Sequence, residues 1–151
     1  MDTLVIEKLE NKYIEDFITY NQEAFHTAYE EYFGKSEKKI ISKAKIKENI
    51  NGKNSIAYQV LLNNELIGGV IVQINEITNI NELDTLFIKN GLQCKGLGYK
   101  VWKEIEKKYP NTKIWRAHTP YCDKRNIHFY VNKCGFHITE FNDPHYKCIR
   151  E

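Results

Sequence analysis

The residues best suited to do chemistry lie near the middle of the chain, at positions 93–98, with the sequence Gln-Cys-Lys-Gly-Leu-Gly. An alternating segment, 83–88, precedes this run and is typical of a half-buried strand. After it, Leu97, Val101 and Ile105 recur at four-residue steps, as on the buried face of a helix. A glycine-containing turn between a strand and a helix exposes backbone N–H groups at the positive end of the helix dipole. The pattern therefore predicts a site for a phosphate group.

A second segment, 126–136, follows the first by about one strand and one turn. It combines Asn126, a Phe-Tyr pair ending at Tyr130, and a Gly-Phe exit. Together, the Gln-x-x-Gly-x-Gly loop and the Asn-x-x-Phe-Tyr…Gly-Phe helix resemble the acetyl-CoA-binding segments of the GNAT superfamily of N-acetyltransferases, over residues 82–136. Thr119-Pro120 and Arg125-Asn126 look like a small, single-domain bacterial branch of it. The resemblance implies an acyltransferase that moves the acetyl group of acetyl-CoA to a primary amine by direct nucleophilic attack.

The resemblance also implies which residues bind the coenzyme. The backbone from Gln93 to Tyr99 is expected to contact the pyrophosphate. In the family, a β-bulge on the preceding strand frees backbone groups for the pantetheine arm and the acetyl oxygen, and here it falls on residues 86–88, with the Ile88 N–H donating to the carbonyl. Asn126 is expected to bond the pantetheine arm or to cap its helix. The expected coenzyme-binding set is Leu86, Phe87, Ile88, Gln93, Cys94, Lys95, Gly96, Leu97, Gly98, Tyr99, Asn126 and Tyr130.

Acetyl transfer to an amine also requires proton transfers. Glu82 and Asp84 are the candidate bases, because residues two apart on a strand share a face and because family members keep an acid near these positions. The alternative is that both are exposed carboxylates on the polar side of the sheet. Tyr130 is the candidate general acid, since a phenol with a pKa near ~10 can protonate a departing thiolate.

The spacing after Tyr130 departs from the family pattern. Family members usually have three residues between this tyrosine and Gly-Phe, whereas residues 131–134 make four here. Ile127 and Phe129 match the family positions before the tyrosine, which places the extra residue in the exit turn. Counting back from Gly135 instead places Val131 at the site, and Tyr130 then has a packing role.

The end of the first predicted helix borders the acceptor cleft in the resembled fold. His26 and Tyr29, together with Glu82, are the expected substrate-binding residues, and Glu30, Tyr32 and Phe33 lie beside them. Acidic and aromatic side chains suit a cationic amine. The expected acceptor is a small amine or a peptide N-terminus. The alternative is that the aromatic residues belong to the core and the glutamates to the solvent face.

Length and composition exclude several classes of protein. The 151 residues fit a single domain, 1–151, with 42% hydrophobic residues and a formal charge of only +2. No segment is long and apolar enough for a membrane span, and the first residues lack a signal sequence, so a cytoplasmic protein without a membrane partner is expected. Seven lysines between residues 35 and 53 are typical of a solvated helix face rather than a nucleic-acid site. The oligomeric state stays open, and a homodimer is compatible with the sequence.

The four cysteines do not predict a disulfide framework in a chain with its own core. A zinc site could be drawn from two cysteines and two histidines, but their spacing is not that of a zinc knuckle, and no metal is expected. Because no histidine pairs with Cys94 or Cys122 at motif spacing, a covalent acetyl-cysteine route is disfavoured. The set drawn for zinc is Cys134, His137, His145 and Cys148.

The elements expected along the chain have the order β-α-α-β-β-β-α-β-α-β-β. This order predicts an α/β fold, with a central mixed sheet flanked by about four helices, as in the GNAT fold. A turn at Asn63-Asn64 joins two of the strands, Gly68-Gly69 indicates a bulge or a close approach, and Ser36 is expected to cap the second helix. The strands are expected at 3–9, 55–62, 66–74, 82–88, 112–118, 136–141 and 146–149, and the helices at about 13–33, 36–50, 98–108 and 126–133.

Two other functions remain open from the sequence. One is a GNAT-fold module that binds coenzyme A as a sensor or scaffold without turnover. The other is a lysine-rich nucleic-acid binder.

Overall fold

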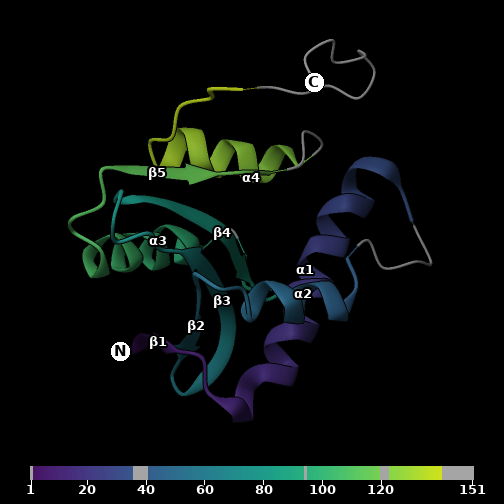
Figure 1. Ribbon diagram of the computed structural model, residues 1–151. Coiled ribbons are helices and arrows are strands. Elements are labelled where there is room, and N and C mark those ends of the chain that lie inside the picture. The colour runs from purple at the N-terminus through teal and green to yellow at the C-terminus, as the bar shows by residue number, and fades with distance from the viewer. Residues whose placement is uncertain (1, 36–40, 94, 120–122, 141–151) are drawn as a thin grey trace. The chain divides into compact units, whose positions relative to one another are not determined.

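The computed structural model describes residues 2–35, 41–93, 95–119 and 123–140, which fall into two compact units, Met1–His118 and Thr119–Glu151. The first unit contains a five-stranded mixed sheet with strands in the order β1-β2-β3-β4-β5 (Figure 1). Its strands are β1 (Leu4–Lys8), β2 (Ser55–Leu62), β3 (Glu65–Gln73), β4 (Ile80–Ile88) and β5 (Ile114–Ala117). Its helices are α1 (Ile14–Phe33), which follows the 3-10 turn η1 (Asn11–Tyr13), α2 (Lys43–Ile50) and α3 (Leu97–Lys108).

The first four strands form an antiparallel meander. The hairpin between β2 and β3 turns at Asn63 and Asn64, whose φ angles of 51° and 69° are the left-handed values that a tight hairpin requires. The predicted hairpin is therefore confirmed. Gly34 ends α1 as predicted, with a φ of 88° and its N–H donating to the Glu30 carbonyl at 2.8 Å.

α1 packs on one face of the sheet through Phe17. This side chain is fully buried, and its ring meets the ring of Phe87 edge-on at a centroid distance of 5.0 Å. Gly69 lies opposite Phe87 in the β-ladder, and a Cβ placed there would lie 2.1 Å from Cε2 of Phe17. The absence of a side chain at Gly69 thus makes room for the ring that holds α1 on the sheet.

The predicted irregularity at Gly68-Gly69 is also present. Between β2 and β3 the register shifts after Val60, which pairs with Gly68, to Leu61, which pairs with Leu66, so Ile67 is the extra residue of a bulge. A Cβ on Gly68 would lie 2.4 Å from the Phe87 carbonyl oxygen. The close backbone approach is therefore confirmed at Gly68, and the bulge lies at the residue directly before it.

α3 packs on the opposite face. Tyr58 pairs with Val70, the neighbour of Gly69, so strand alternation turns Tyr58 away from the face that holds Phe17. The Tyr58 hydroxyl is hydrogen-bonded to the hydroxyl of Tyr109, the residue that follows α3. Figure 1 shows α3 and the α1–α2 pair on different sides of the strands. The buried residues of α3 are Val101, Trp102 and Ile105.

β5 runs parallel to β4, because α3 supplies the crossover connection between them. Trp115 of β5 meets Trp102 of α3 edge-on, with the ring centroids 5.1 Å apart. This contact fixes α3 against the strand that follows it.

The second helix begins later than the sequence predicts. α2 starts at Lys43, and the Ser42 side chain caps it by accepting a hydrogen bond from the Lys45 N–H at 3.0 Å. Ile41 lies outside the helix, and Ser36, the expected cap, lies outside the described residues. Ser42 is suited to the cap position because it lies directly before the helical run that buries Ile46.

The second unit contains α4 (Lys124–His128) and a π-helical turn, η2 (Phe129–Lys133). The Asp123 side chain caps α4 by accepting from the Asn126 N–H at 3.0 Å. The predicted strand at 136–141 is not present in its described part, since residues 136–140 carry no strand. The rest of the predicted closing hairpin, including 146–149, lies outside the described residues.

The mixed sheet with helices on both faces confirms the predicted fold class, and the element order agrees from β1 to α4. Of the helices that the structure describes, none has the length and hydropathy of a membrane span.

Candidate active site

β4 carries a bulge, but not where the sequence predicts it. Ile71 of β3 pairs with Thr85 and Val72 pairs with Leu83, so Asp84 is the extra residue. Residues 86–88, where the bulge was expected, pair in regular register with β3. The bulge lies at Asp84 rather than at residues 86–88 because Phe87 and Ile88 pack closely against Gly68 and Gly69 of β3, which requires a regular register there.

The ladder between β4 and β5 ends near this bulge. The parallel pairing covers residues 80–83 of β4 and ends there. Further along, the Lys89 N–H donates to the Ile67 carbonyl of β3 at 2.6 Å. Because backbone polar groups alternate along a strand, the N–H and C=O of Ile88 are directed to the other edge. The Ile88 carbonyl there accepts a hydrogen bond from Nε2 of Gln93 at 3.3 Å.

The predicted phosphate loop leads into α3 through a left-handed turn at Gly96. Gly96 is the N-cap residue, with a φ of 76° and no capping side chain. The first backbone bond of the helix runs from the Lys100 N–H to the Gly96 carbonyl at 3.3 Å, so the N–H groups of residues 97–99 precede the helical ladder. Apart from its chain neighbours, no atom of the described residues lies within 4 Å of a Cβ placed on Gly96. This helix end can therefore accept an anion, although Cys94 lies outside the described residues.

The two candidate bases lie close together, as their spacing predicts. Burial raises the pKa of the Asp84 carboxyl above its ordinary 3.8, and the negative charge of Glu82 adds to this effect. A hydrogen bond with the Gln73 side chain opposes the rise in pKa, and so do the nearby His118 and Lys45. The Glu82 side chain is 37% exposed, and its Oε1 lies 3.8 Å from Nε2 of His118. A half-buried carboxyl with a raised pKa is suited to general-base chemistry.

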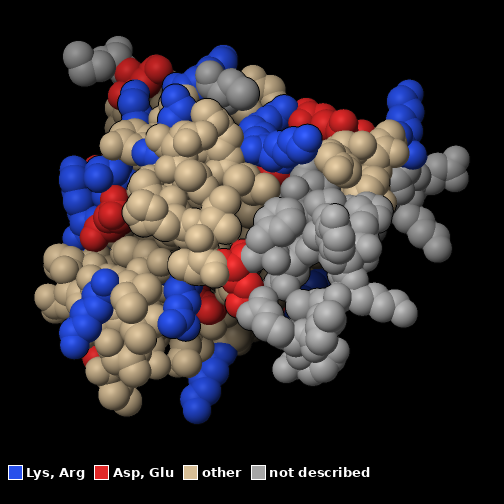
Figure 2. All heavy atoms as spheres, turned by 90° about the horizontal axis from the view of Figure 1, so that it is seen from above, with Lys and Arg blue, Asp and Glu red and all other residues tan. Residues whose placement is uncertain are grey.

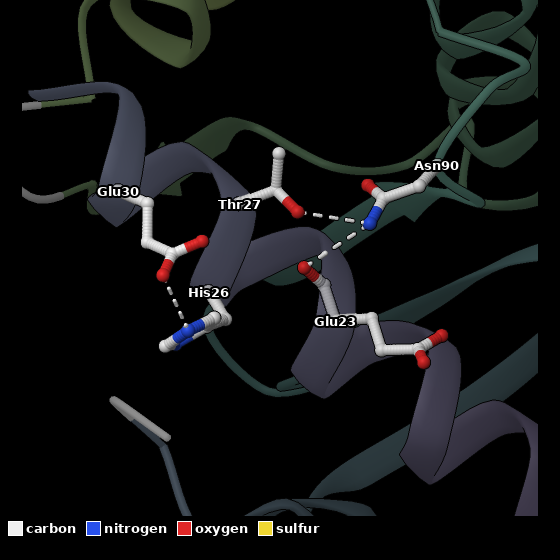
Figure 3. A network of polar contacts seen from close by, with 5 residues as sticks. All are labelled: Glu23, His26, Thr27, Glu30 and Asn90. Carbon is white, nitrogen blue, oxygen red and sulfur yellow. Dashed lines mark hydrogen bonds and ion pairs between the residues drawn. The ribbon is translucent and has the colours of Figure 1, made fainter. Parts of the chain in front are cut away.

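The residues expected at the acceptor site lie on the last turns of α1. His26 is buried, and its Nε2 lies 3.2 Å from Oε2 of Glu30 (Figure 3). Tyr29 is half-buried, and its ring is 4.6 Å from that of Phe33. Tyr32 and Phe33 are nearly half exposed, so the aromatic stripe is not all core. The buried side of α1 continues through polar residues, Asn21, Gln22 and His26.

The structure adds two polar residues that sequence reasoning missed. Gln73, at the end of β3, is hydrogen-bonded to Asp84. Asn90, just after β4, donates from Nδ2 to Oγ1 of Thr27 at 2.9 Å and to the carbonyl of Glu23 at 3.4 Å (Figure 3). Asn90-Gly91 has the composition of a turn, and no motif indicates a partner on a helix 63 residues earlier.

The second unit holds the other two candidate residues. The Cys134 N–H donates to the Phe129 carbonyl at 3.0 Å, which closes a π-helical turn and absorbs the extra residue before Gly135. Tyr130 lies within this turn and is buried, with its ring 5.6 Å from that of Phe136. Since Asp123 caps α4, the expectation that Asn126 caps it is wrong. The roles of Asn126 and Tyr130 toward a coenzyme stay predictions.

Surface charge and potential metal ligands do not indicate a further function for this site. On the face seen in Figure 2, the described basic side chains are interspersed with acidic ones and form no continuous basic area. Within the described ranges, no three His, Cys, Asp or Glu side chains are grouped as metal ligands. His145 and Cys148, which were drawn with Cys134 and His137 as a zinc set, lie outside those ranges.

Comparisons with known proteins agree with the fold. The model of the acetyltransferase (GNAT) family matches residues 7–136. YrkN, an uncharacterized protein of Bacillus subtilis strain 168, is 40% identical over 144 residues, which cover 95% of this chain and 78% of YrkN. The chain therefore belongs to the acetyltransferase (GNAT) family, as its two motifs predict.

Solved structures show the same fold at low identity. One is a PaiA N-acetyltransferase from Thermoplasma acidophilum in complex with coenzyme A, with a TM-score of 0.70, 21% identity and 94% coverage of both chains. Another is an aminoglycoside acetyltransferase, meta-AAC0020, from an uncultured soil metagenomic sample, in complex with sisomicin. Its TM-score is 0.61, with 17% identity and 96% coverage of both chains.

Proposed function

We propose that this chain is an N-acetyltransferase that uses acetyl-CoA and acetylates a primary amine by direct attack. The observation that carries the proposal is the start of α3 at the left-handed Gly96, where the N–H groups of residues 97–99 precede the first backbone bond of the helix. Family membership supports the proposal, and so does the coenzyme A in the PaiA relative.

The residues of the loop fit the coenzyme by their donors. The N–H groups of residues 97–99 and the positive end of α3 suit a pyrophosphate, and the open space above Gly96 lets an anion approach. Acetyl-CoA supplies a thioester carbonyl, and the Ile88 N–H, directed to the open edge of β4, suits its oxygen. A backbone donor held by the sheet needs little reorganisation to stabilise negative charge that develops on that oxygen.

Asp84 is the base that we favour for the amine. An alkyl ammonium with a pKa near ~10.4 is almost fully protonated at neutral pH, so its proton must be removed before attack. Asp84 is the unpaired residue of the bulge, and its raised pKa makes it a better proton acceptor than an ordinary carboxylate. Glu82 remains the second candidate, and Tyr130 the proposed acid for the departing thiolate.

The proposed acceptor is a small amine or a peptide N-terminus. His26 and Tyr29 on α1, together with Glu82, are the proposed acceptor-binding residues. The aminoglycoside acetyltransferase relative, in complex with sisomicin, supports a small amine, and a peptide N-terminus is also compatible with the site.

Calorimetry with coenzyme A tests the loop. The wild-type chain should bind, and Gly96→Val should weaken binding by at least about tenfold while its circular dichroism spectrum is retained, because the branched side chain fills the open space and disfavours a φ of 76°. Gly34→Val is the matched control, since Gly34 has a φ of 88° and equally open surroundings at the far end of α1. Undiminished affinity in Gly96→Val would refute the loop assignment.

Turnover requires a second measurement. Release of free thiol from acetyl-CoA should appear with at least one member of an amine library. Coenzyme binding without thiol release across the library would instead favour a sensor or scaffold.

A further inference from the structure

The four-residue connector between β4 and the phosphate loop, residues 89–92, is held to α1 at two points. The Lys89 ammonium lies over the ring of Tyr20, 4.6 Å from its centroid. Asn90 donates both to the hydroxyl of Thr27 and to the carbonyl of Glu23, as Figure 3 shows. Three residues of α1 thus contact a segment more than 60 residues later in the chain.

These contacts use one stripe of α1. Tyr20, Glu23 and Thr27 are spaced by three and four residues, so they lie along the same side of the helix. His26 and Glu30 form their contact on the same turns, and in Figure 3 they point to another side of the helix from Asn90. The helical turns that contact the connector therefore also carry proposed acceptor residues.

The connector itself has little freedom. The Leu92 N–H donates to the Lys89 carbonyl at 3.1 Å, which closes a turn, and the Lys89 N–H is fixed to β3. The next residue, Gln93, is bonded through its side chain to Ile88. A ligand that restrains the backbone of the loop will therefore also restrain Asn90, because only two residues separate Asn90 from Gln93.

We propose that Asn90 is a positioning residue that couples the coenzyme loop to α1. Coenzyme A bound at the loop restrains the connector, and the hydrogen bonds of Asn90 pass this restraint to residues 23–30 of α1. The inference rests on the proposed coenzyme site. Coupling of this kind is reciprocal, so an acceptor that orders α1 will also tighten coenzyme binding.

Hydrogen–deuterium exchange of the whole chain, with and without coenzyme A, tests the coupling. In the wild type, the coenzyme should slow exchange of the amides of residues 23–30 by at least about fivefold, the lower end of typical coupling. Asn90→Ala and Thr27→Val should lose most of this protection while calorimetry still detects coenzyme binding. Thr27→Ser keeps the hydroxyl and should restore the protection.

Thr19→Val is the matched control. Thr19 is also a half-buried threonine of α1, but its hydroxyl accepts from Nζ of Lys43 at 3.4 Å, a contact with α2 rather than with the connector. This variant should keep the protection. Coenzyme binding without slower exchange in α1, or full protection in Thr27→Val, would overturn the coupling and leave the proposed function intact. Absence of coenzyme binding to the wild type would instead remove the proposed function.

Discussion

Asp84 shows how one residue can gain a chemical role from its backbone position. As the extra residue of a bulge, it lies beside Glu82 and Gln73 instead of pairing with β3. Burial and the neighbouring carboxylate raise its pKa, and the Gln73 hydrogen bond limits the rise. Gln73 is thus expected to tune the pH at which Asp84 becomes ionised.

The two carboxylates should differ in their effect on activity. A base must be ionised, so kcat/KM should fall as the pH drops through the raised pKa of Asp84. Asp84→Asn should lower kcat by about 100-fold or more, the usual scale for a general base. Glu82→Gln should keep most activity and move the acid limb to lower pH, because it removes a negative neighbour. A pH profile of kcat/KM for each variant checks this. If Glu82→Gln loses activity and Asp84→Asn keeps it, Glu82 is the base.

The ionised carboxylate of Asp84 should also lower the stability of the folded chain at neutral pH. Its pKa is higher in the folded chain than the ordinary 3.8, so the folded state binds the proton more tightly and loses stability as the pH rises through the folded pKa. Asp84→Asn should therefore raise the Tm at pH 7. The difference in Tm between the variant and the wild type should shrink when the pH falls below the pKa of Asp84 in the unfolded chain. This opposite change in activity and stability is typical of a functional site.

For single residues, the sequence identified the candidate catalytic side chains but not the residues that hydrogen-bond to them. The spacing of Glu82 and Asp84 was enough to expect them close together, because residues two apart are near neighbours along a strand, although the bulge at Asp84 was not expected. Gln73 and Asn90 could not be found in this way. Their partners depend on the register between strands, or on the rotation of α1 over the connector, and no local pattern encodes either.

Among the elements, the position of α1 depends on one missing side chain. Gly69→Ala should lower the free energy of unfolding by about 1–3 kcal/mol, because the new Cβ overlaps the rings of Phe17 and Phe87. Urea unfolding measures the change. Phe17→Leu in the same chain should recover part of it, since two substitutions in direct contact are not additive. If the losses of unfolding free energy from the two substitutions were additive, the overlap with Phe17 would not be the cause of the destabilisation by Gly69→Ala.

The elements that follow from turn chemistry and periodicity were predictable. Asn63-Asn64 tolerates the left-handed backbone of a hairpin, and Gly34 that of a helix end. The bulge at Asp84 and the π-helical turn could not be predicted from local patterns. Each inserts one residue into an element whose residue types remain those of an ordinary strand or helix. The unusual spacing before Gly135 did indicate an insertion, and the turn at 129–133 is where the chain accommodates it.

For the whole molecule, coenzyme binding should appear as added stability. A ligand that binds only the folded chain raises its free energy of unfolding by about 2.7 kcal/mol at 100 times its Kd. Acetyl-CoA should thus raise the Tm in a concentration-dependent way in the wild type and much less in Gly96→Val. Differential scanning fluorimetry at several concentrations measures this, and an equal rise in both proteins would place the coenzyme elsewhere.

The paired rings of Trp102 and Trp115 give this molecule a built-in optical probe. They are the only two tryptophans in the sequence, and they lie 5.1 Å apart. Intrinsic emission excited at the red edge therefore originates from one spot, where α3 rests on β5, rather than from the chain as a whole. A spectral change on titration can be assigned to the seating of that helix without a label, and an early loss of signal on heating will report the release of α3.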